Sequence, residues 1–118
     1  VLIKVIDPAD PTAVSNMLPA NGTLGVDQPL RLSWSPAQFA SRYDIYIWPE
    51  GETQPAQPTV ANIPAINFTL SNNSLEFGRN YQWKVVAKNS CRSTPGPIQI
   101  FFVRRLPDLV VRNVQTPT

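Results

Sequence analysis

Histidine is absent from this sequence of 118 residues, and cysteine occurs only once. Without histidine the chain cannot form a Ser-His-Asp or Cys-His catalytic group, nor a zinc site with a histidine ligand. The single cysteine, Cys91, excludes a disulfide within the chain. The stability of the fold must therefore come from a packed apolar core.

Charge is also scarce, because ten Lys and Arg against eight Asp and Glu leave a net charge of +2. Nucleic-acid-binding proteins gather Lys and Arg on one face, whereas the densest basic group here is Arg104 and Arg105, followed later by Arg112. We therefore expect no nucleic-acid partner. No apolar run approaches the ~18 residues of a membrane-spanning helix.

The chain begins with Val, and its apolar run Val1–Ile6 is too short for a signal peptide. We expect a piece of a longer protein whose export signal lies elsewhere.

Thirteen prolines are spread along the chain, which disfavours long helices because proline removes a backbone donor and clashes with the preceding turn. No window shows a helical apolar rhythm over more than one turn. Short runs alternate between apolar and polar residues instead, which is typical of strands with one buried face. Strands are predicted at residues 30–35, 43–48, 57–63, 67–70, 81–88 and 98–103. This spacing indicates an all-β sandwich or barrel.

The alternation also predicts which side chains face inward. Trp34 ends one alternating strand, Tyr43 begins the next, and Tyr81 and Trp83 lie on the inner face of a third. Residues 98–103 are apolar on both faces, so their orientation stays open.

Proline-bounded segments flank this region on both sides. Residues 1–13 are predicted to be a linker or the end of a preceding unit, although Val1–Ile6 would also suit an added edge strand. Residues 104–118, with a short strand at 109–111, are predicted to be a linker or the start of a following domain. The compact domain is then residues 14–103.

The run Leu75-Glu76-Phe77-Gly78-Arg79-Asn80-Tyr81 resembles the Leu-x-Pro-Gly-Thr-x-Tyr signature of the fibronectin type III domain, with Phe77 in place of Pro and Arg79 in place of Thr. The strands that end in Trp34 and begin at Tyr43 also match in order. The resemblance covers roughly residues 16–103 and is similar to the bacterial surface and secreted versions. It implies a seven-stranded antiparallel Greek-key sandwich, immunoglobulin-like. The tail Leu106–Val111 resembles the opening of a cell-adhesion-related β-sandwich repeat.

The tyrosine motif has a physical reason of its own. In sandwiches this hydroxyl bonds a backbone group a few residues upstream, where the chain crosses between the sheets. We expect Tyr81 to do so, Gly78 to supply an unusual backbone angle, and Leu75 to pack beneath the ring. Trp34 and Trp83 should fill the core from facing sheets.

Tyr46 and Trp48 would point outward if Tyr43 and its alternating partners face the core. Three interpretations remain open for this pair: cover by the proline-rich segment 49–58, contact with a partner, or stacking on a sugar ring.

Other candidate sites are weaker. The carboxylates Glu50 and Glu52 have no third partner nearby in the sequence, so no catalytic residue and no cofactor are predicted. No metal site is predicted. The alternative is a calcium site at an inter-domain joint, formed by Asp7, Asp10 and Asp27. Cys91 is either an inert loop residue or the partner of a cysteine outside this chain. Acceptor patterns for N-glycosylation begin at Asn21, Asn67 and Asn72.

These features together predict a structural or interaction module, not an enzyme, within a larger extracellular or cell-surface protein, with neighbouring domains of the same chain as partners. The alternative is an accessory module that binds carbohydrate or protein through Tyr46, Trp48 and the loops.

Overall fold

The computed structural model describes residues 10–72 and 74–105. Within them the chain forms nine strands and no helix, so no helix there is available to cross a membrane. The strands are β1 (Ser15–Leu18), β2 (Thr23–Val26), β3 (Arg31–Ser35), β4 (Arg42–Pro49), β5 (Val60–Ile63), β6 (Asn67–Thr69), β7 (Asn80–Lys88), β8 (Ser93–Pro95) and β9 (Gln99–Val103). The strands expected at 1–6 and 109–111, together with Asp7 and Arg112, lie outside the described residues.

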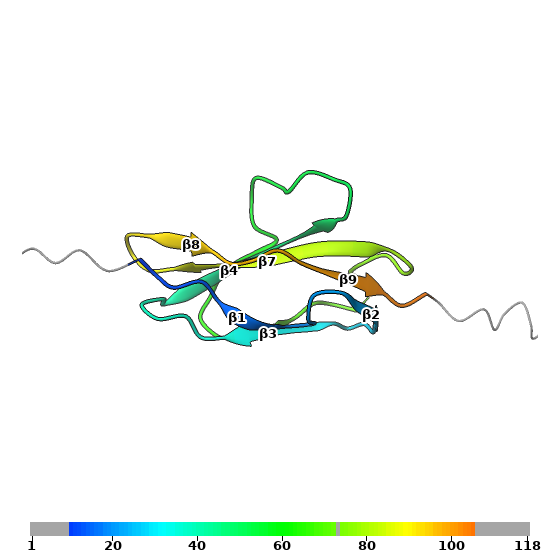
Figure 1. Cartoon of the computed structure of the whole chain (residues 1–118), viewed down its shortest axis with the longest axis horizontal. Helices are drawn as coiled ribbons and strands as arrows, with labels where there is room; N and C mark the ends of the chain where they lie inside the picture. Colours follow the sequence, from blue (N-terminus) through cyan, green and yellow to red (C-terminus); the bar gives the residue numbers. More distant parts are fainter. Residues whose placement is uncertain (1–9, 73, 106–118) are drawn as a thin grey trace, which may run out of the picture.

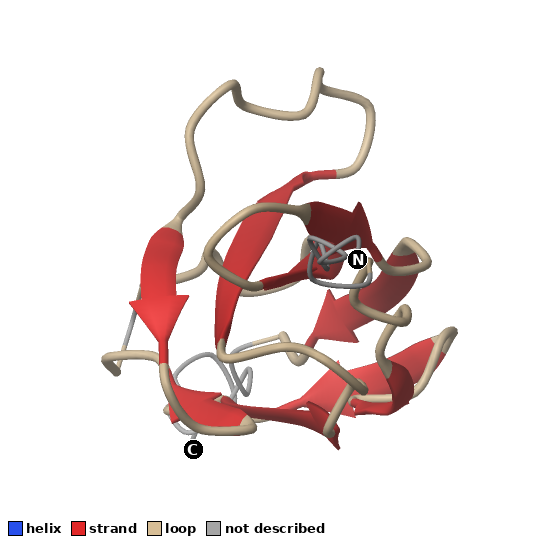
Figure 2. Ribbon diagram, turned by 90° about the vertical axis from the view of Figure 1, so that its left-hand side faces the viewer, coloured by secondary structure: helices blue, strands red, loops and turns tan. Residues whose placement is uncertain are grey.

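Two sheets face each other, and the predicted β-sandwich is confirmed (Figures 1 and 2). The smaller sheet has the order β1-β3-β6, and the larger has the order β2-β9-β7-β4-β5, with β8 also paired to β7. The longest pairing joins β4 to β7 in antiparallel register from Arg42↔Lys88 to Pro49↔Tyr81. This pair forms the centre of the larger sheet.

The described residues form nine strands, whereas the resemblance implies seven. The difference arises because the first and the last strand of the sandwich are each divided into two. The first run pairs with β3 as β1, then crosses to the other sheet and pairs with β9 as β2, in parallel. The last run pairs with β7 twice, as β8 and as β9. Pro97, just before β9, has no backbone donor for a continuous ladder. Strands β1, β2 and β8 were not among the predicted ranges.

In strands β3 and β7, every second side chain is buried, as the alternation of apolar and polar residues predicts. In β7 the side chains of Tyr81, Trp83, Val85 and Ala87 are buried, and the residues between them are partly exposed. Strand β9 resolves the ambiguity of its two-sided apolar run, because Phe101 and Val103 face the core. Its remaining apolar side chains therefore lie on the outer face of the sheet.

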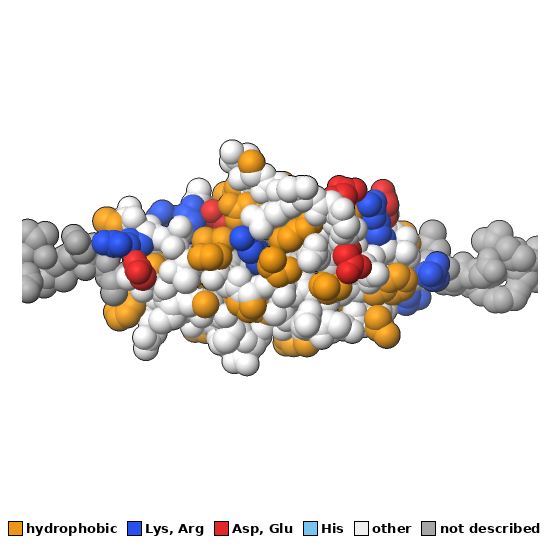
Figure 3. All heavy atoms as spheres, turned by 45° about the horizontal axis from the view of Figure 1, so that its top comes forward, with side chains coloured by type: hydrophobic (Ala, Val, Ile, Leu, Met, Phe, Trp, Pro, Cys, Tyr) orange, Lys and Arg blue, Asp and Glu red, His pale blue; other side chains and the backbone are white. Residues whose placement is uncertain are grey.

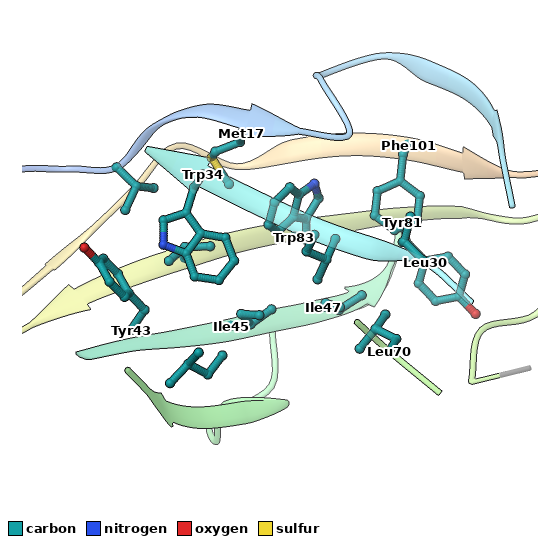
Figure 4. Packing of buried hydrophobic residues seen from close by; sticks show 14 of the residues in the cluster. Met17, Leu30, Trp34, Tyr43, Ile45, Ile47, Leu70, Tyr81, Trp83 and Phe101 are labelled. Carbon is teal, nitrogen blue, oxygen red and sulfur yellow. The ribbon is translucent and has the colours of Figure 1, made fainter. Parts of the chain in front are cut away.

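The core lies between the two sheets and is rich in aromatic side chains (Figure 4). Trp34 from β3 and Tyr43 from β4 meet edge to face, with ring centroids 5.5 Å apart. Trp83 is completely buried, and Tyr81 stacks on Phe101 at 6.1 Å. Aromatic side chains of this size each bury roughly 150–250 Å². These rings therefore account for much of the apolar surface that folding removes from water.

The chain crosses between the sheets just before β7, where Tyr81 anchors the crossing. Its hydroxyl accepts a hydrogen bond from the backbone N–H of Glu76, at 2.9 Å. Gly78 has a φ of 73°, in the left-handed region where residues with a Cβ are disfavoured. Leu75 packs against the core from this segment, and the Gln28 side chain bonds both its N–H and its carbonyl. The corner before β7 is thus held by the Tyr81 hydroxyl and by the Gln28 side chain.

The described chain enters the sandwich at one end and leaves it at the other (Figure 1). At the entry, the backbone N–H of Thr12 donates to the carbonyl of Gln38. At the exit, the N–H of Arg104 donates to the carbonyl of Val26. The packed unit therefore includes residues just outside the predicted limits of 14 and 103.

Candidate functional site

The alternative binding function predicts a binding surface on the outer face of the larger sheet, through Tyr46 and Trp48. Both residues do lie on that face of β4, opposite Lys84 and Gln82 of β7. Trp48 is only 5% exposed, so the exposure that the alternative binding function needs is absent at this residue. Its indole N–H donates to the side-chain oxygen of Gln82 at 3.0 Å. A ring held in this way has no free face for stacking on a sugar.

The loop that follows β4 is the segment expected to cover the pair. Residues 50–59 rise above the outer side of the larger sheet before the chain enters β5 (Figure 1). The loop is anchored at its far end by Thr59, whose N–H donates to the carbonyl of Ile45 and whose hydroxyl accepts from the N–H of Ile47. Since Trp48 is not part of the core cluster, its cover must come from the outer side. The burial of Trp48 excludes sugar stacking for this ring and is consistent with cover by the proline-rich segment 49–58. The alternation of side chains along β4 predicts the face of Trp48 correctly, but it carries no information on what lies over that face.

Tyr46 remains partly exposed on the same face. The ammonium group of Lys84 lies 5.4 Å from the centre of its ring. A cation over an exposed ring contributes about 0.5–1 kcal/mol. This contact orders the two side chains, but by itself it does not define a ligand site.

A second feature of this face, which the sequence did not single out, is an open groove of about 570 Å³ near the exit of the chain. Its lining residues are Leu24, Gly25, Asn80, Phe102, Arg104 and Arg105. Leu24 is 79% exposed, and the guanidinium of Arg105 lies 5.5 Å from the centre of the Phe102 ring. Arg104 is paired with Asp27. In the space-filling view, hydrophobic patches are scattered among polar groups on this side of the molecule (Figure 3).

A third feature is a polar cluster drawn from three adjacent strands. Asp44 of β4 is buried, and its carboxylate forms an ion pair with Lys88 of β7, with an N–O distance of 3.1 Å. The Lys88 ammonium also donates to the side-chain carbonyl of Asn62 in β5, at 2.9 Å. The backbone N–H of Asn62 donates to Asp44 at 2.8 Å. A buried carboxylate is costly unless it is paired in this way. The three residues are far apart in sequence, so no local motif indicated the cluster.

The carboxylates Glu50 and Glu52, from which no catalytic site is predicted, have separate partners. Glu52 is bound to Arg79 at 3.0 Å, and Glu76 binds the same guanidinium at 2.8 Å. The hydrogen bond that Arg79 donates to the Glu76 carboxylate is the main cause that raises the pKa of Arg79 above its ordinary value. Glu50 forms a backbone bond to Asn80 instead. The exposed carboxylates here serve an ion-pair network around the corner before β7.

The proposed calcium site is wrong for the part of it that is described. Asp10 lies at the entry end, 3.5 Å from Arg92, whereas Asp27 follows β2 at the exit end and binds Arg104 (Figure 1). Two carboxylates at opposite ends cannot share one cation, and Asp7 lies outside the described residues. Among residues 10–72 and 74–105, no three His, Cys, Asp or Glu side chains gather as a metal site would require.

Cys91 is exposed at the tip of the turn between β7 and β8. The side-chain oxygen of Asn89 accepts hydrogen bonds from the N–H groups of Cys91 and Arg92, which shapes this turn. Asn21, the first residue of one glycosylation pattern, uses its side-chain oxygen to bind the N–H of Ile100. The pattern at Asn72 runs through residue 73, outside the described residues.

Comparisons with known proteins agree with this architecture. No protein-family model and no curated protein matches the chain. Among solved structures, the crystal structure of an Fn3-like protein from Clostridium thermocellum is similar, with a TM-score of 0.59, 18% identity, and coverage of 82% of this chain and 97% of that one. A computationally redesigned β-sandwich protein is similar as well, with a TM-score of 0.56, 16% identity, and coverage of 84% of this chain and 98% of that one. At these identities the likeness bears on the fold alone, and the chain has a fibronectin type III-like β-sandwich fold.

Proposed function

We propose that this chain is a non-catalytic structural module that holds its neighbours at a fixed distance within a larger extracellular or cell-surface protein, of the bacterial type. The observation that carries the proposal is the arrangement of the ends: the described chain enters at one end of the sandwich and leaves at the other (Figure 1). A unit of this shape adds its own length between whatever precedes and follows it.

Both ends are tied to the body of the sandwich, as a rigid spacer requires. Thr12 is bonded to Gln38 by both its backbone N–H and its hydroxyl. Arg104 is bonded through its backbone to Val26 and through its side chain to Asp27. The linkers and neighbouring domains predicted for residues 1–13 and 104–118 are part of this proposal.

The extracellular and adhesion-related setting is supported by the sequence, which resembles bacterial surface and secreted fibronectin type III domains. Cell fractionation of the parent protein tests this part, and a purely cytosolic location would contradict it.

A replacement experiment in the parent protein tests the spacer role. In one variant, an unrelated β-sandwich with ends at opposite poles replaces residues 10–105. In the other, a flexible Gly/Ser linker of equal residue number replaces them. We expect the sandwich to restore function and the linker to fail. Failure of both variants would contradict a passive spacer and would show that this surface itself is needed.

A second candidate function is an accessory module that binds carbohydrate or protein. Since Trp48 is buried, this function has to move from Trp48 to the groove beside Leu24 and Phe102. NMR titration with candidate glycans tests it: shifts confined to Leu24, Phe102 and Arg105 would support binding at the groove, and an unchanged spectrum would exclude those glycans.

A further inference from the structure

The cluster of Asp44, Lys88 and Asn62 places an amine, an amide and a carboxylate in mutual contact. The Lys88 Nζ atom lies 2.9 Å from Asn62 Oδ1 and 3.1 Å from Asp44 Oδ2. Because a C=O bond is about 1.2 Å long, Nζ lies at most about 4 Å from the amide carbon of Asn62. Reacting atoms that are poised for attack are about 3–3.5 Å apart. A small rotation of the lysine side chain therefore brings the amine to its electrophile.

We propose that Lys88 and Asn62 form an intramolecular isopeptide bond, with Asp44 transferring the protons. The Lys88 ammonium first gives a proton to the Asp44 carboxylate, and the free amine attacks Cγ of Asn62. The Asp44 carboxyl then protonates the Nδ2 group, and the C–N bond to Nδ2 breaks. The products are a Lys88–Asn62 amide and ammonia, which leaves as ammonium with the second proton from Nζ. No oxidant or cofactor is needed, and Asp44 ends as it began.

The backbone of β5 is shaped to present Asn62 to this site. Between the pairs Tyr43↔Ile63 and Ile45↔Val60, three steps along β5 match two along β4, so the register contains a bulge. Asn62 lies in that bulge with a φ of 57°, in the left-handed region. Bulges redirect a side chain relative to its strand. Here the Asn62 side chain reaches across β4 towards Lys88 of β7, over Asp44.

Burial and positioning favour the carboxylate as the proton carrier. The Asp44 side chain is 10% exposed, and the Lys88 side chain 23%. The backbone N–H of Asn62 donates to Asp44 Oδ1 at 2.8 Å, and the Lys88 ammonium lies 3.2 Å from that oxygen and 3.1 Å from Oδ2. The Asp44 carboxylate lies within hydrogen-bond reach of the attacking Nζ atom, which is the position that general acid–base catalysis requires of a group that takes the proton from the amine.

The bond would tie the edge strand β5 to the central strand β7 across β4, which is the middle strand of the three. This covalent link would serve a chain in which Cys91 has no second cysteine to bond with. The inference does not depend on the spacer role, because the bond would form in the isolated chain.

Intact mass spectrometry of the purified, denatured chain tests the proposal directly. We expect a mass lower than the sequence mass by one ammonia molecule, and a branched peptide that joins Lys88 to Asn62 after digestion. The full sequence mass would overturn the proposal and leave an ion pair only. Loss of one water molecule would also overturn it, since that loss corresponds to an amide between Lys88 and Asp44.

Three variants identify the residues that are responsible for the loss of ammonia. Lys88→Arg keeps a cation beside Asp44 but removes the amine, and Asp44→Ala removes the proton carrier; we expect the full variant mass in both. The matched control Lys84→Arg should still lose ammonia, because Lys84 lies over Tyr46 and not beside an amide. If Asp44→Ala fails to fold, Lys88→Arg alone decides. Ammonia loss that persists in Lys88→Arg would overturn the proposal and point to another asparagine, such as Asn21 before Gly22.

Discussion

Replacing Tyr81 by Phe removes a single oxygen atom from the corner before β7. The ring stays in place against Phe101, since the two rings stack at 6.1 Å and Phe has the same ring. What is lost is the hydroxyl that accepts the N–H of Glu76 at 2.9 Å. The substitution therefore isolates one hydrogen bond from the packing around it.

The size of the effect follows from the burial of that bond. Tyr81 is only 6% exposed, so the hydroxyl end of the bond is shielded from water, while Glu76 itself lies at the surface. A buried donor left without a partner costs about 1–3 kcal/mol, and the net value of a typical bond is about 0.5–1.5 kcal/mol. We expect Tyr81→Phe to lower the free energy of unfolding by about 1–2 kcal/mol.

Urea denaturation followed by tryptophan fluorescence measures this loss. With a slope of about 2 kcal/mol/M, within the usual range for a small protein, the urea midpoint should fall by roughly 0.5–1 M. Tyr46→Phe is the matched control, because the described residues give the Tyr46 hydroxyl no hydrogen bond and the change should stay within about 0.5 kcal/mol. Equal midpoints for the two variants would refute the anchoring role of Tyr81.

Three further predictions concern the cavity left at Trp34, the close packing at Gly96 and the burial of the tryptophans. Trp34→Ala should cost about 3–5 kcal/mol, because it leaves a large cavity between the sheets; a thermal melt like that of the unchanged chain would remove Trp34 from the core. Gly96→Ala should cost about 1–3 kcal/mol, because an added Cβ would lie 2.9 Å from both the Val85 carbonyl and a Val14 methyl group; calorimetry checks this, and an unaltered Tm would contradict it. Iodide should scarcely quench native tryptophan fluorescence, since all three tryptophans are at most 5% exposed; strong quenching would show that Trp48 is open to solvent.

Much of the fold could be predicted because several strands are buried on one face only. In β3 and β7, apolar and polar residues alternate, and burial in the structure alternates with them. Such a pattern fixes both the strand and its inner face. The run 98–103 lacks this contrast, so only the structure shows that Phe101 faces inward while Ile98 stays exposed.

The missed strands lack that local signal for physical reasons. Strand β1 contains Asn16 with a φ of 50° and pairs with β3 through a register shift. Strand β2 is mostly exposed and is held in place by its parallel partner β9. Strand β8 has three residues and only a partly buried centre. Each of these segments is extended because of its neighbours and not because of its own residue pattern.

The candidate sites depended still more on distant contacts. The face of Trp48 followed from the alternation of side chains along β4, but its burial depends on the residues that pack over that face. Likewise, Lys88 meets Asp44 across 44 positions of sequence, and it meets Asn62 across 26. Contacts between strands so far apart depend on sheet order and bulges, which no single segment encodes.

The contact between Trp34 and Tyr43 tests the facing of the two sheets most directly. These rings come from β3 and β4, which belong to different sheets, and their centroids are 5.5 Å apart. A nuclear Overhauser spectrum of the folded chain should show cross-peaks between the indole protons of Trp34 and the ring protons of Tyr43. If the signals of both residues are assigned but no such cross-peaks are seen, the sandwich is contradicted. Chemical shifts typical of an unfolded chain would contradict it as well.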